Sequence, residues 1–303
     1  MSERVRVLVG GRELELSNLD KVLYPGAGFS KGEVIDYYTR VAPVLLPHLR
    51  GRPLTRIRYP NGVGAAGFFE KNAPAGTPDW VHLERLAVPG STTGRQLLDY
   101  VVVDDLPTLV WLANLAALEL HTPQWRIGPD GPARPDLIVF DLDPGPPAGL
   151  GECCEVALLL RERLTADGLR GYPKTSGRKG MQLVCPIAGE QSADEVTGYA
   201  RRLGEELERA APGLVVARMA PRLRPGKVFI DWSQNNGAKT TVAPYSLRAQ
   251  PTPTVSAPLT WAEVAAAAMV PAELTAGVVL SRIAERGDLL AGLCGPGPRV
   301  PSR

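Results

Sequence analysis

The spacing of apolar residues predicts a chain in which strands and helices alternate. Residues 4–16 alternate apolar and polar positions on both sides of a Gly-Gly pair, which is the pattern of a β-hairpin. From about residue 31 to 49, apolar residues recur every three or four positions and predict an amphipathic helix. Ser30 and Glu33 form the pattern of a capping box at its start.

The middle of the chain adds further strands and a second helix. Strand-like stretches cover 54–70 and 81–104. Residues 106–120 are apolar nearly all round, which we interpret as one buried helix. The run D-L-I-V-F-D-L-D at 136–143 predicts a central strand that ends in acids, and a long helix is expected at 151–167.

The last third continues the alternation. Residues 173–186 predict two strands joined by a glycine-rich turn, 192–211 predict a helix, and K-V-F-I-D-W at 227–232 predicts another apolar strand that ends in an acid. The Pro-rich remainder is expected to hold one or two helices, and the residues after Leu293 are expected to fray. With no visible repeat or linker, we expect a single α+β domain over residues 1–303.

Composition and charge exclude several classes of protein. The 303 residues are 44% hydrophobic, and 34 Lys and Arg nearly balance 32 Asp and Glu, for a formal net charge of +2. This balance excludes a histone-like polycation that coats DNA indiscriminately. No apolar run is long enough to cross a bilayer, and the first residues lack the apolar segment of a signal peptide. We therefore expect a cytoplasmic protein with no membrane partner.

Sulfur and imidazole offer no pattern for a metal site. The chain has four cysteines and three histidines; the histidines are scattered, and the cysteines include no C-x-x-C pair. We expect reduced, mostly buried thiols, at Cys153, Cys154, Cys185 and Cys294.

Three carboxylates at the ends of predicted strands are the candidate chemistry. Asp141 and Asp143 are two positions apart, so a strand points both side chains to one face, and Asp231 ends a second apolar strand. Oxygen ligands of this kind suit hard cations, and two Mg²⁺ or Mn²⁺ ions about 3.5–4 Å apart would clamp an in-line phosphoryl displacement. On the residues alone, Asp143-Pro144-Gly145 is also compatible with an ordinary turn.

The loop K-T-S-G-R-K-G at 174–180 lies between the acidic strands in the sequence. Its glycines permit close backbone approach, Ser176 offers a hydroxyl, and Arg178 and Lys179 add positive charge, so the loop suits phosphate binding. It lacks the spacing of a Walker A loop. A turn with solvated charges is the alternative interpretation.

Six segments together resemble the polymerase domain of bacterial DNA ligase D, which belongs to the archaeo-eukaryotic primase superfamily and works in non-homologous end joining. The resemblance runs from about residue 12 to about 293. The segments are L-S-N-L-D-K-V-L-Y-P (16–25), G-F-F-E-K-N (67–72), L-E-L-H-T-P-Q-W (118–125), F-D-L-D-P-G (140–145), T-S-G-R-K-G (175–180) and V-F-I-D-W-S-Q-N-N-G-A-K-T-T-V-A-P-Y-S-L-R (228–248).

The resemblance implies an α+β primase-polymerase fold, in which an RRM-like catalytic sheet is flanked by helices and a second mixed sheet. It implies a DNA-dependent nucleotidyltransferase that extends primers, fills short gaps at breaks, prefers ribonucleotides and uses two divalent ions, Mn²⁺ or Mg²⁺. The expected substrates are NTPs or dNTPs and 5′-phosphorylated DNA with gaps or double-strand breaks. Ku and a separate DNA ligase are candidate partners, and a nucleoid-associated location follows.

The resemblance also assigns roles to individual residues. The catalytic, metal-binding acids would be Asp141, Asp143 and Asp231. The incoming nucleotide would be held by His121, Ser176, Lys179, Gln182, Arg224, Gln234 and Arg248. Lys21 and Lys31 would grip the downstream 5′-phosphate, and Phe68 and Phe69 would stack on the template.

One position departs from the pattern of the family. Its phosphate-binding motif commonly ends in histidine where this chain has Gln182. Histidine can carry a proton or a charge, whereas glutamine can only form hydrogen bonds. We therefore expect lower activity than with histidine at this position.

Two other functions stay open on the sequence. One is a non-catalytic or weakly active module that binds DNA ends through Lys21 and Lys31. The other, less favoured, is a phosphohydrolase that uses the D-x-D pair. The chain has no K-x-D-G adenylation motif and no His/Asp-rich cluster, so we expect neither a ligase nor a phosphoesterase domain in it.

Overall fold

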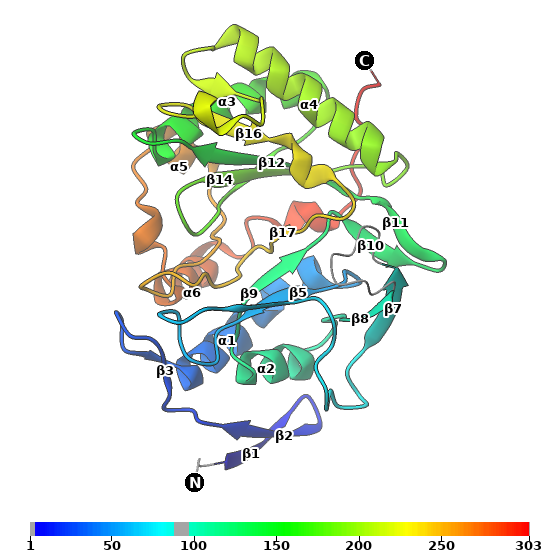
Figure 1. Cartoon of the computed structure of the whole chain (residues 1–303), viewed down its shortest axis with the longest axis vertical. Helices are drawn as coiled ribbons and strands as arrows, with labels where there is room; N and C mark the ends of the chain where they lie inside the picture. Colours follow the sequence, from blue (N-terminus) through cyan, green and yellow to red (C-terminus); the bar gives the residue numbers. More distant parts are fainter. Residues whose placement is uncertain (1–3, 88–96, 303) are drawn as a thin grey trace.

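The computed structural model describes residues 4–87 and 97–302, in which helices lie outside two larger sheets (Figure 1). The helices are α1 (Lys31–Leu49), α2 (Leu106–Asn114), α3 (Leu150–Ala166), α4 (Ala193–Ala210), α5 (Trp261–Ala266) and α6 (Ala276–Arg286), with short 3₁₀ helices η1 (Pro221–Leu223), η2 (Trp232–Asn235), η3 (Pro271–Glu273) and η4 (Ala291–Cys294). The strands of the first half are β1 (Arg4–Val9), β2 (Arg12–Ser17), β3 (Val22–Tyr24), β4 (Phe29–Ser30), β5 (Thr55–Arg58), β6 (Phe68–Glu70), β7 (Leu83–Ala87), β8 (Leu97–Val101) and β9 (Ala117–Thr122). Those of the second half are β10 (Trp125–Gly128), β11 (Gly131–Pro135), β12 (Leu137–Pro144), β13 (Tyr172–Thr175), β14 (Met181–Pro186), β15 (Val215–Val216), β16 (Val228–Asp231) and β17 (Thr241–Val242).

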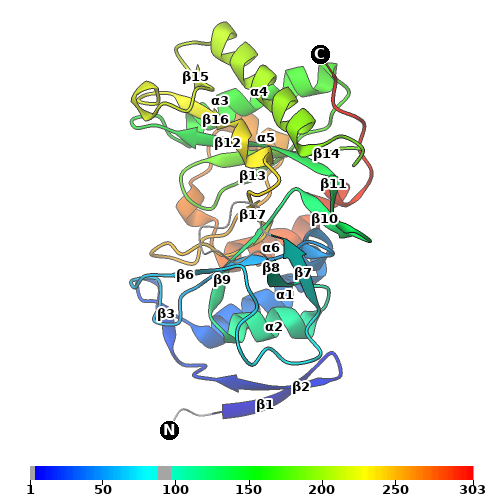
Figure 2. The ribbon, with the colours of Figure 1, turned by 45° about the vertical axis from the view of Figure 1, so that its right-hand side comes forward.

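The larger sheet has the strand order β13-β14-β12-β16-β15. Its main strands and helices follow one another as β12-α3-β13-β14-α4-β16, which is the β-α-β-β-α-β succession of an RRM-like sheet. All its pairs are antiparallel except β15 with β16. Helices α3 and α4 cover one face (Figures 1 and 2), so the acid-bearing strands β12 and β16 are neighbours near the centre of the sheet.

The second sheet has the order β17-β9-β5-β6 and packs against α1 and α2 (Figure 2). Its strands are antiparallel throughout, whereas the resemblance implied a mixed sheet; the parallel pair lies in the other sheet. The expected α+β class is confirmed. Strand β17 follows β16 in the sequence but pairs with β9, so the segment between them joins the two sheets.

The prediction of one helix over 106–120 was wrong in its second half. Helix α2 ends at Asn114, and Ala116 takes a left-handed conformation with φ 57°, which reverses the chain. Residues 117–122 then form strand β9, buried on both faces. A short apolar run of this kind fits a buried helix and a buried strand equally well, so periodicity could not separate the two.

The ends of several elements follow the sequence signals. Ser30 with Glu33, and Ser192 with Glu195, form capping boxes at the starts of α1 and α4. The expectation of fraying after Leu293 was wrong, because the Val300 amide donates to Gln191 over 2.8 Å and the Val300 side chain is only 2% exposed. In the described ranges, no helix has the length and apolar character needed to cross a membrane.

Candidate active site

The three predicted acids lie on adjacent strands. Strand β12 alternates, so Phe140 and Leu142 join the core while Asp141 and Asp143 point to the opposite face. The antiparallel register places Asp141 directly opposite Asp231 of β16. The structure therefore brings together the carboxylates that the two apolar strands were predicted to present.

Burial and neighbouring carboxylates raise the pKa values of Asp141 and Asp143. Burial, together with the charges of Asp143 and Asp231, raises the pKa of Asp141 to about 7, against an opposing hydrogen bond from Gln182. Burial and Asp231 also raise the pKa of Asp143, while Arg224 opposes the shift. The nearby positive charges of Arg224 and Lys174 do not fully compensate these acids, whose hard oxygen atoms suit a divalent cation.

Asp231 is held by its own chain. Its Oδ1 accepts from the Ser233 hydroxyl at 2.5 Å and from the Ser233 amide at 3.1 Å, and its Oδ2 accepts from Gln234 Nε2 at 2.8 Å. Over the described residues, no three acidic, histidine or cysteine side chains are gathered as a ready metal-ligand cluster. The carboxylate oxygens and the strand register fit a divalent metal. To bind one, the Asp231 carboxylate would give up its hydrogen bonds to Ser233 and Gln234.

Gln182, which the resemblance placed among the nucleotide-binding residues, contacts Asp141. It lies opposite Asp141 in the pairing of β14 with β12, and its Nε2 donates to Asp141 Oδ1 over 3.2 Å. Its Oε1 accepts from Lys174 Nζ at 2.6 Å. Lys174 is only 1% exposed and also donates to Ser256 Oγ and the Val242 carbonyl, and burial lowers its pKa to about 7. A buried polar chain therefore runs from Lys174 through Gln182 to Asp141.

The glycine-rich turn packs against Arg248. Gly177 has φ +71°, and a Cβ there would lie 2.5 Å from Arg248 Cγ, so only glycine fits. Arg248 Nη1 donates to the Ser176 carbonyl over 2.7 Å. Lys179 is exposed on the same turn. The structure thus places Ser176, Lys179 and Arg248 together, beside strand β12.

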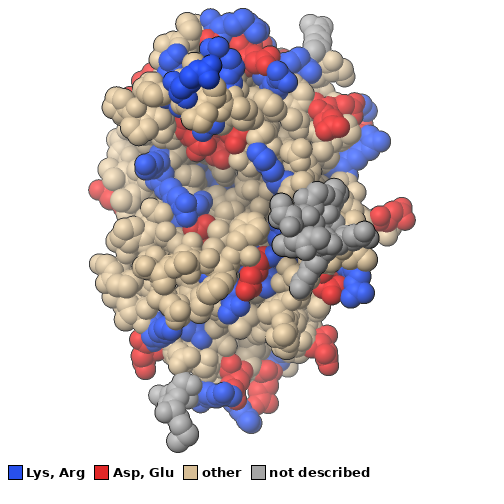
Figure 3. All heavy atoms as spheres, viewed as in Figure 1, with Lys and Arg blue, Asp and Glu red and all other residues tan. Residues whose placement is uncertain are grey.

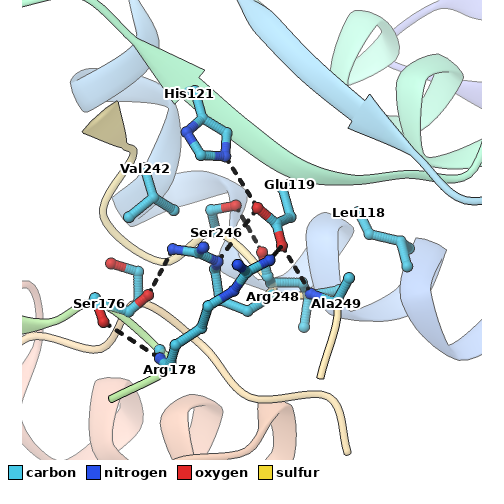
Figure 4. Close-up of polar contacts among 12 residues, drawn as sticks. Leu118, Glu119, His121, Ser176, Arg178, Val242, Ser246, Arg248 and Ala249 are labelled. Carbon is cyan, nitrogen blue, oxygen red and sulfur yellow. Dashed lines mark hydrogen bonds and ion pairs between the residues drawn. The ribbon is translucent and has the colours of Figure 1, made fainter. Parts of the chain in front are cut away.

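Glu119 organises the basic side chains around this turn (Figure 4). Its carboxylate accepts from His121 Nε2 at 3.0 Å, from Arg178 Nη2 at 3.0 Å and from the Ala249 amide at 3.0 Å, and it lies 3.3 Å from Arg248 Nε. Burial raises the pKa of Glu119, but the bond from His121 and the charge of Arg248 outweigh it and lower that pKa to about 2. One fully buried anion therefore holds three nitrogen-bearing side chains.

Sequence reasoning assigned no role to Glu119. The available signal was an acid within the apolar run 117–122, two positions before His121 and hence on the same face of a strand. The mistaken helix over this region hid that relationship.

Arg224 lies at the edge of the acids. A Cβ on Gly145 would lie 2.2 Å from the Arg224 carbonyl, so the Asp-Pro-Gly sequence lets the two backbones meet. The Arg224 guanidinium stacks 3.8 Å above the centre of the Phe229 ring. It is close enough to Asp143 to oppose the rise in the pKa of that carboxyl. Gln234 contacts Asp231, as described above.

Lys21 and Lys31 form a separate basic site beside β3 and β4, in the half of the molecule that carries α1 (Figure 1). Lys31 is 5% exposed, and its Nζ donates to the Ser17 carbonyl over 2.5 Å. Lys21 Nζ donates to Asn61 Oδ1 over 3.3 Å. Burial, with the charges of Lys21 and Arg58, lowers the pKa of Lys31 to about 8. A bound anion would relieve the repulsion between these two lysines.

Phe68 and Phe69 lie on β6, at the edge of the second sheet. Their side chains are 54% and 62% exposed, which is unusual for large aromatic residues in a strand. Glu70 on the same strand pairs with Arg56 at 2.8 Å and with Arg58 at 3.0 Å, so these arginines hold the strand. The two aromatic side chains therefore face solvent and are not packed in the core.

A groove adjoins this edge. It encloses about 1540 Å³, and its lining includes Phe69, Lys71, Trp125, Ser192 and Lys239. Figure 3 shows one face of the molecule hollowed between its upper and lower parts, with Lys and Arg side chains at the margin. Such a surface suits an extended polyanion.

Comparison with known proteins decides the family. Residues 30–290 match the family described as "LigD, primase-polymerase domain". The chain belongs to this family. It is 46% identical to the multifunctional non-homologous end joining protein LigD of Mycolicibacterium smegmatis, over 94% of this chain and 36% of that protein. It is 34% identical to the bifunctional LigD of Bacillus subtilis, over 91% of this chain and 43% of that protein.

A solved structure agrees with this assignment to the LigD primase-polymerase family. The polymerase domain of Mycobacterium tuberculosis ligase D, in complex with DNA, superposes with a TM-score of 0.87 at 44% identity, covering 94% of this chain and 99% of that one. The chain spans 36% to 43% of the length of these LigD relatives. The α+β fold and the enzyme class, a primase-type nucleotidyltransferase with general dependence on a divalent metal, are confirmed.

Proposed function

We propose that this chain is a single catalytic domain that extends primers and fills short gaps at DNA breaks, in non-homologous end joining. The observation that carries the proposal is the register of Asp141 opposite Asp231, beside the turn that contains Ser176 and contacts Arg248. Acids that suit a metal thus lie next to basic side chains that suit a triphosphate.

Asp141, Asp143 and Asp231 would hold two divalent ions, Mn²⁺ or Mg²⁺. When bound, such ions lower the pKa of a primer 3′-hydroxyl and neutralise charge on the triphosphate. Lys174 and Gln182 fix the orientation of the Asp141 carboxylate.

The chain's own residues would position the nucleotide. Ser176, Lys179, Arg224 and Arg248 offset the triphosphate charge, and His121 contacts sugar or phosphate. Arg178 and Arg248 are paired with Glu119 in this structure, so an incoming triphosphate meets cations that are already held in place. Gln234 supports Asp231.

The remaining sites would hold DNA. Lys21 and Lys31 would bind the 5′-phosphate on the downstream side of a gap, and Phe68 and Phe69 would stack on the template. Ku and a separate ligase are the proposed partners, and a nucleoid-associated, cytoplasmic location follows from that role.

Extension of a gapped, 5′-phosphorylated duplex tests this proposal. Each of the four rNTPs and dNTPs is supplied in Mn²⁺ and, separately, in Mg²⁺. We expect template-directed filling of the gap, faster with ribonucleotides and with Mn²⁺. Tight binding of the gap without incorporation under any condition would instead support a non-catalytic end-binding module.

A further inference from the structure

A second cluster of titratable side chains lies away from the polymerase site, where the end of α1 meets η4. His48 Nε2 lies 2.9 Å from Asp288 Oδ2, and His48 Nδ1 lies 3.6 Å from Cys294 Sγ. The imidazole thus bridges a carboxylate and a thiol through its two ring nitrogens. This is the arrangement in which a histidine accepts a proton from a thiol while the acid orients the ring.

The neighbours of the cluster hold it in place. Tyr245 donates its hydroxyl to Asp288 Oδ1 over 2.6 Å, and the Leu290 amide donates to the same oxygen over 2.8 Å. His48 is 7% exposed, so its ring cannot turn freely. The Asp288 carboxylate is therefore fixed on one side, and the imidazole is fixed between it and Cys294.

Positive charge faces the thiol from two elements. Burial lowers the pKa of His48, but the bonds to Asp288 and Cys294 outweigh burial and raise that pKa. Arg52 is 1% exposed, and a thiolate at Cys294 would be close enough to attract its guanidinium. Arg52 Nη2 pairs with Asp136 at 2.7 Å, yet its buried Nε has no hydrogen-bond partner within the described chain. A thiolate at Cys294 would lie within reach of this positive charge.

We propose that Cys294 is a reactive thiol and a site of reversible modification by low-molecular-weight disulfides. His48 Nδ1 takes the thiol proton, and Cys294 Sγ attacks one sulfur of the disulfide. The disulfide bond breaks as the new S–S bond forms, and the second sulfur leaves as a thiolate that takes up the proton. Cys294 is thereby oxidised and the departing thiol is reduced.

The other cysteines serve as internal controls. Cys153, Cys154 and Cys185 are 0%, 1% and 0% exposed, whereas Cys294 is exposed. Burial raises the pKa of all three thiols, which makes them poor nucleophiles. The native chain is therefore expected to react at one position.

The test measures the reaction of the native chain with bis(2-hydroxyethyl) disulfide, a neutral probe, from pH 6 to 9.5, with peptide mass mapping of the adduct. In the folded chain His48 can take the thiol proton, whereas the urea-unfolded chain has no such base beside the thiol, so the folded chain should react faster at low pH. We expect a single adduct, at Cys294, formed about tenfold faster at pH 6.5 than in the urea-unfolded chain. Cys294→Ser should abolish it.

Asp288→Asn separates the cluster from simple exposure. We expect this variant to react several-fold more slowly at pH 6.5 and at an almost unchanged rate at pH 9.5, where an ordinary thiol ionises without help. If the variant does not fold, the pH profile of the wild-type chain decides alone. A rate that rises about tenfold per pH unit up to about pH 8.5, as for an ordinary thiol, would overturn the proposal. So would the absence of a Cys294 adduct.

Discussion

Gln182 donates a hydrogen bond to Asp141 over 3.2 Å while accepting one from the buried Lys174 over 2.6 Å. The amide is suited to this double role, because it offers a donor and an acceptor at once. The side chain that departs from the family pattern therefore contacts a carboxylate that we propose to be catalytic.

Replacement of Gln182 by His should increase the rate of primer extension. A neutral imidazole keeps one donor for Asp141 and one acceptor for Lys174, and a protonated one adds positive charge beside a carboxyl whose pKa is raised to about 7. The comparison is single-nucleotide extension by both proteins at several Mn²⁺ concentrations. A histidine variant slower than the wild type at every concentration would contradict the expectation.

Replacement of Glu119 by Gln should make the free energy of unfolding less dependent on pH under acidic conditions. The pKa of Glu119 is lowered from 4.5 to about 2 in the folded chain, so its carboxylate stabilises the fold above pH 4.5. That contribution, about 3 kcal/mol at neutral pH, is lost as the pH falls from 4.5 toward 2.

Urea unfolding at pH 7, 4.5 and 3 measures the effect. The Glu119→Gln variant should be less stable than the wild type at pH 7 and should approach it at pH 3. Glu205→Gln, in an exposed pair with Arg201, is the matched control and should change little. Parallel pH curves for Glu119→Gln and wild type would show that Glu119 does not carry this stabilisation.

Replacement of Lys21 by Ala should weaken the preference for a 5′-phosphate. We compare affinity for gapped duplexes that carry a 5′-phosphate or a 5′-hydroxyl on the downstream strand. The variant should bind the 5′-phosphorylated gap about tenfold more weakly than the wild type, because one charged contact is removed. Its affinity for the 5′-hydroxyl gap should change little. Arg40→Ala removes an exposed cation of α1 and should leave the preference intact. An equal loss on both duplexes would rule out a phosphate-specific role.

Replacement of Phe68 by Ala should weaken DNA binding without loss of stability. The side chain is 54% exposed, so its removal leaves little cavity. Stacking of a base on an aromatic ring is worth about 1–3 kcal/mol, which corresponds to a several-fold to 100-fold rise in the KM for primer-template. Thermal unfolding should be nearly unchanged. A large drop in Tm with unchanged KM would make Phe68 a structural residue.

The acid-bearing strands were predictable because each is a short apolar run that ends in aspartate. Strand alternation then places Asp141 and Asp143 on one face. The sequence alone could not show that Asp231 lies opposite Asp141, because pairing of β12 with β16 is a long-range choice that depends on the whole sheet.

The buried polar contacts were not predictable. Lys174 donates hydrogen bonds to oxygen atoms of Gln182, Val242 and Ser256, which are far apart in the sequence. Glu119 similarly meets Arg178 and Arg248 only after β9 and the glycine-rich turn come together. Local patterns identify which side chains are available, whereas their partners follow from tertiary packing.

The most direct test of the account is metal-dependent incorporation of a labelled ribonucleotide into a gapped, 5′-phosphorylated duplex by Asp141→Ala. Asp130→Ala, an exposed acid in the turn between β10 and β11, is the matched control. We predict that Asp141→Ala abolishes incorporation but still binds the gap, because its phosphate and template sites lie elsewhere, and that Asp130→Ala behaves as the wild type. Full incorporation by Asp141→Ala would contradict the assignment of these acids as the catalytic centre.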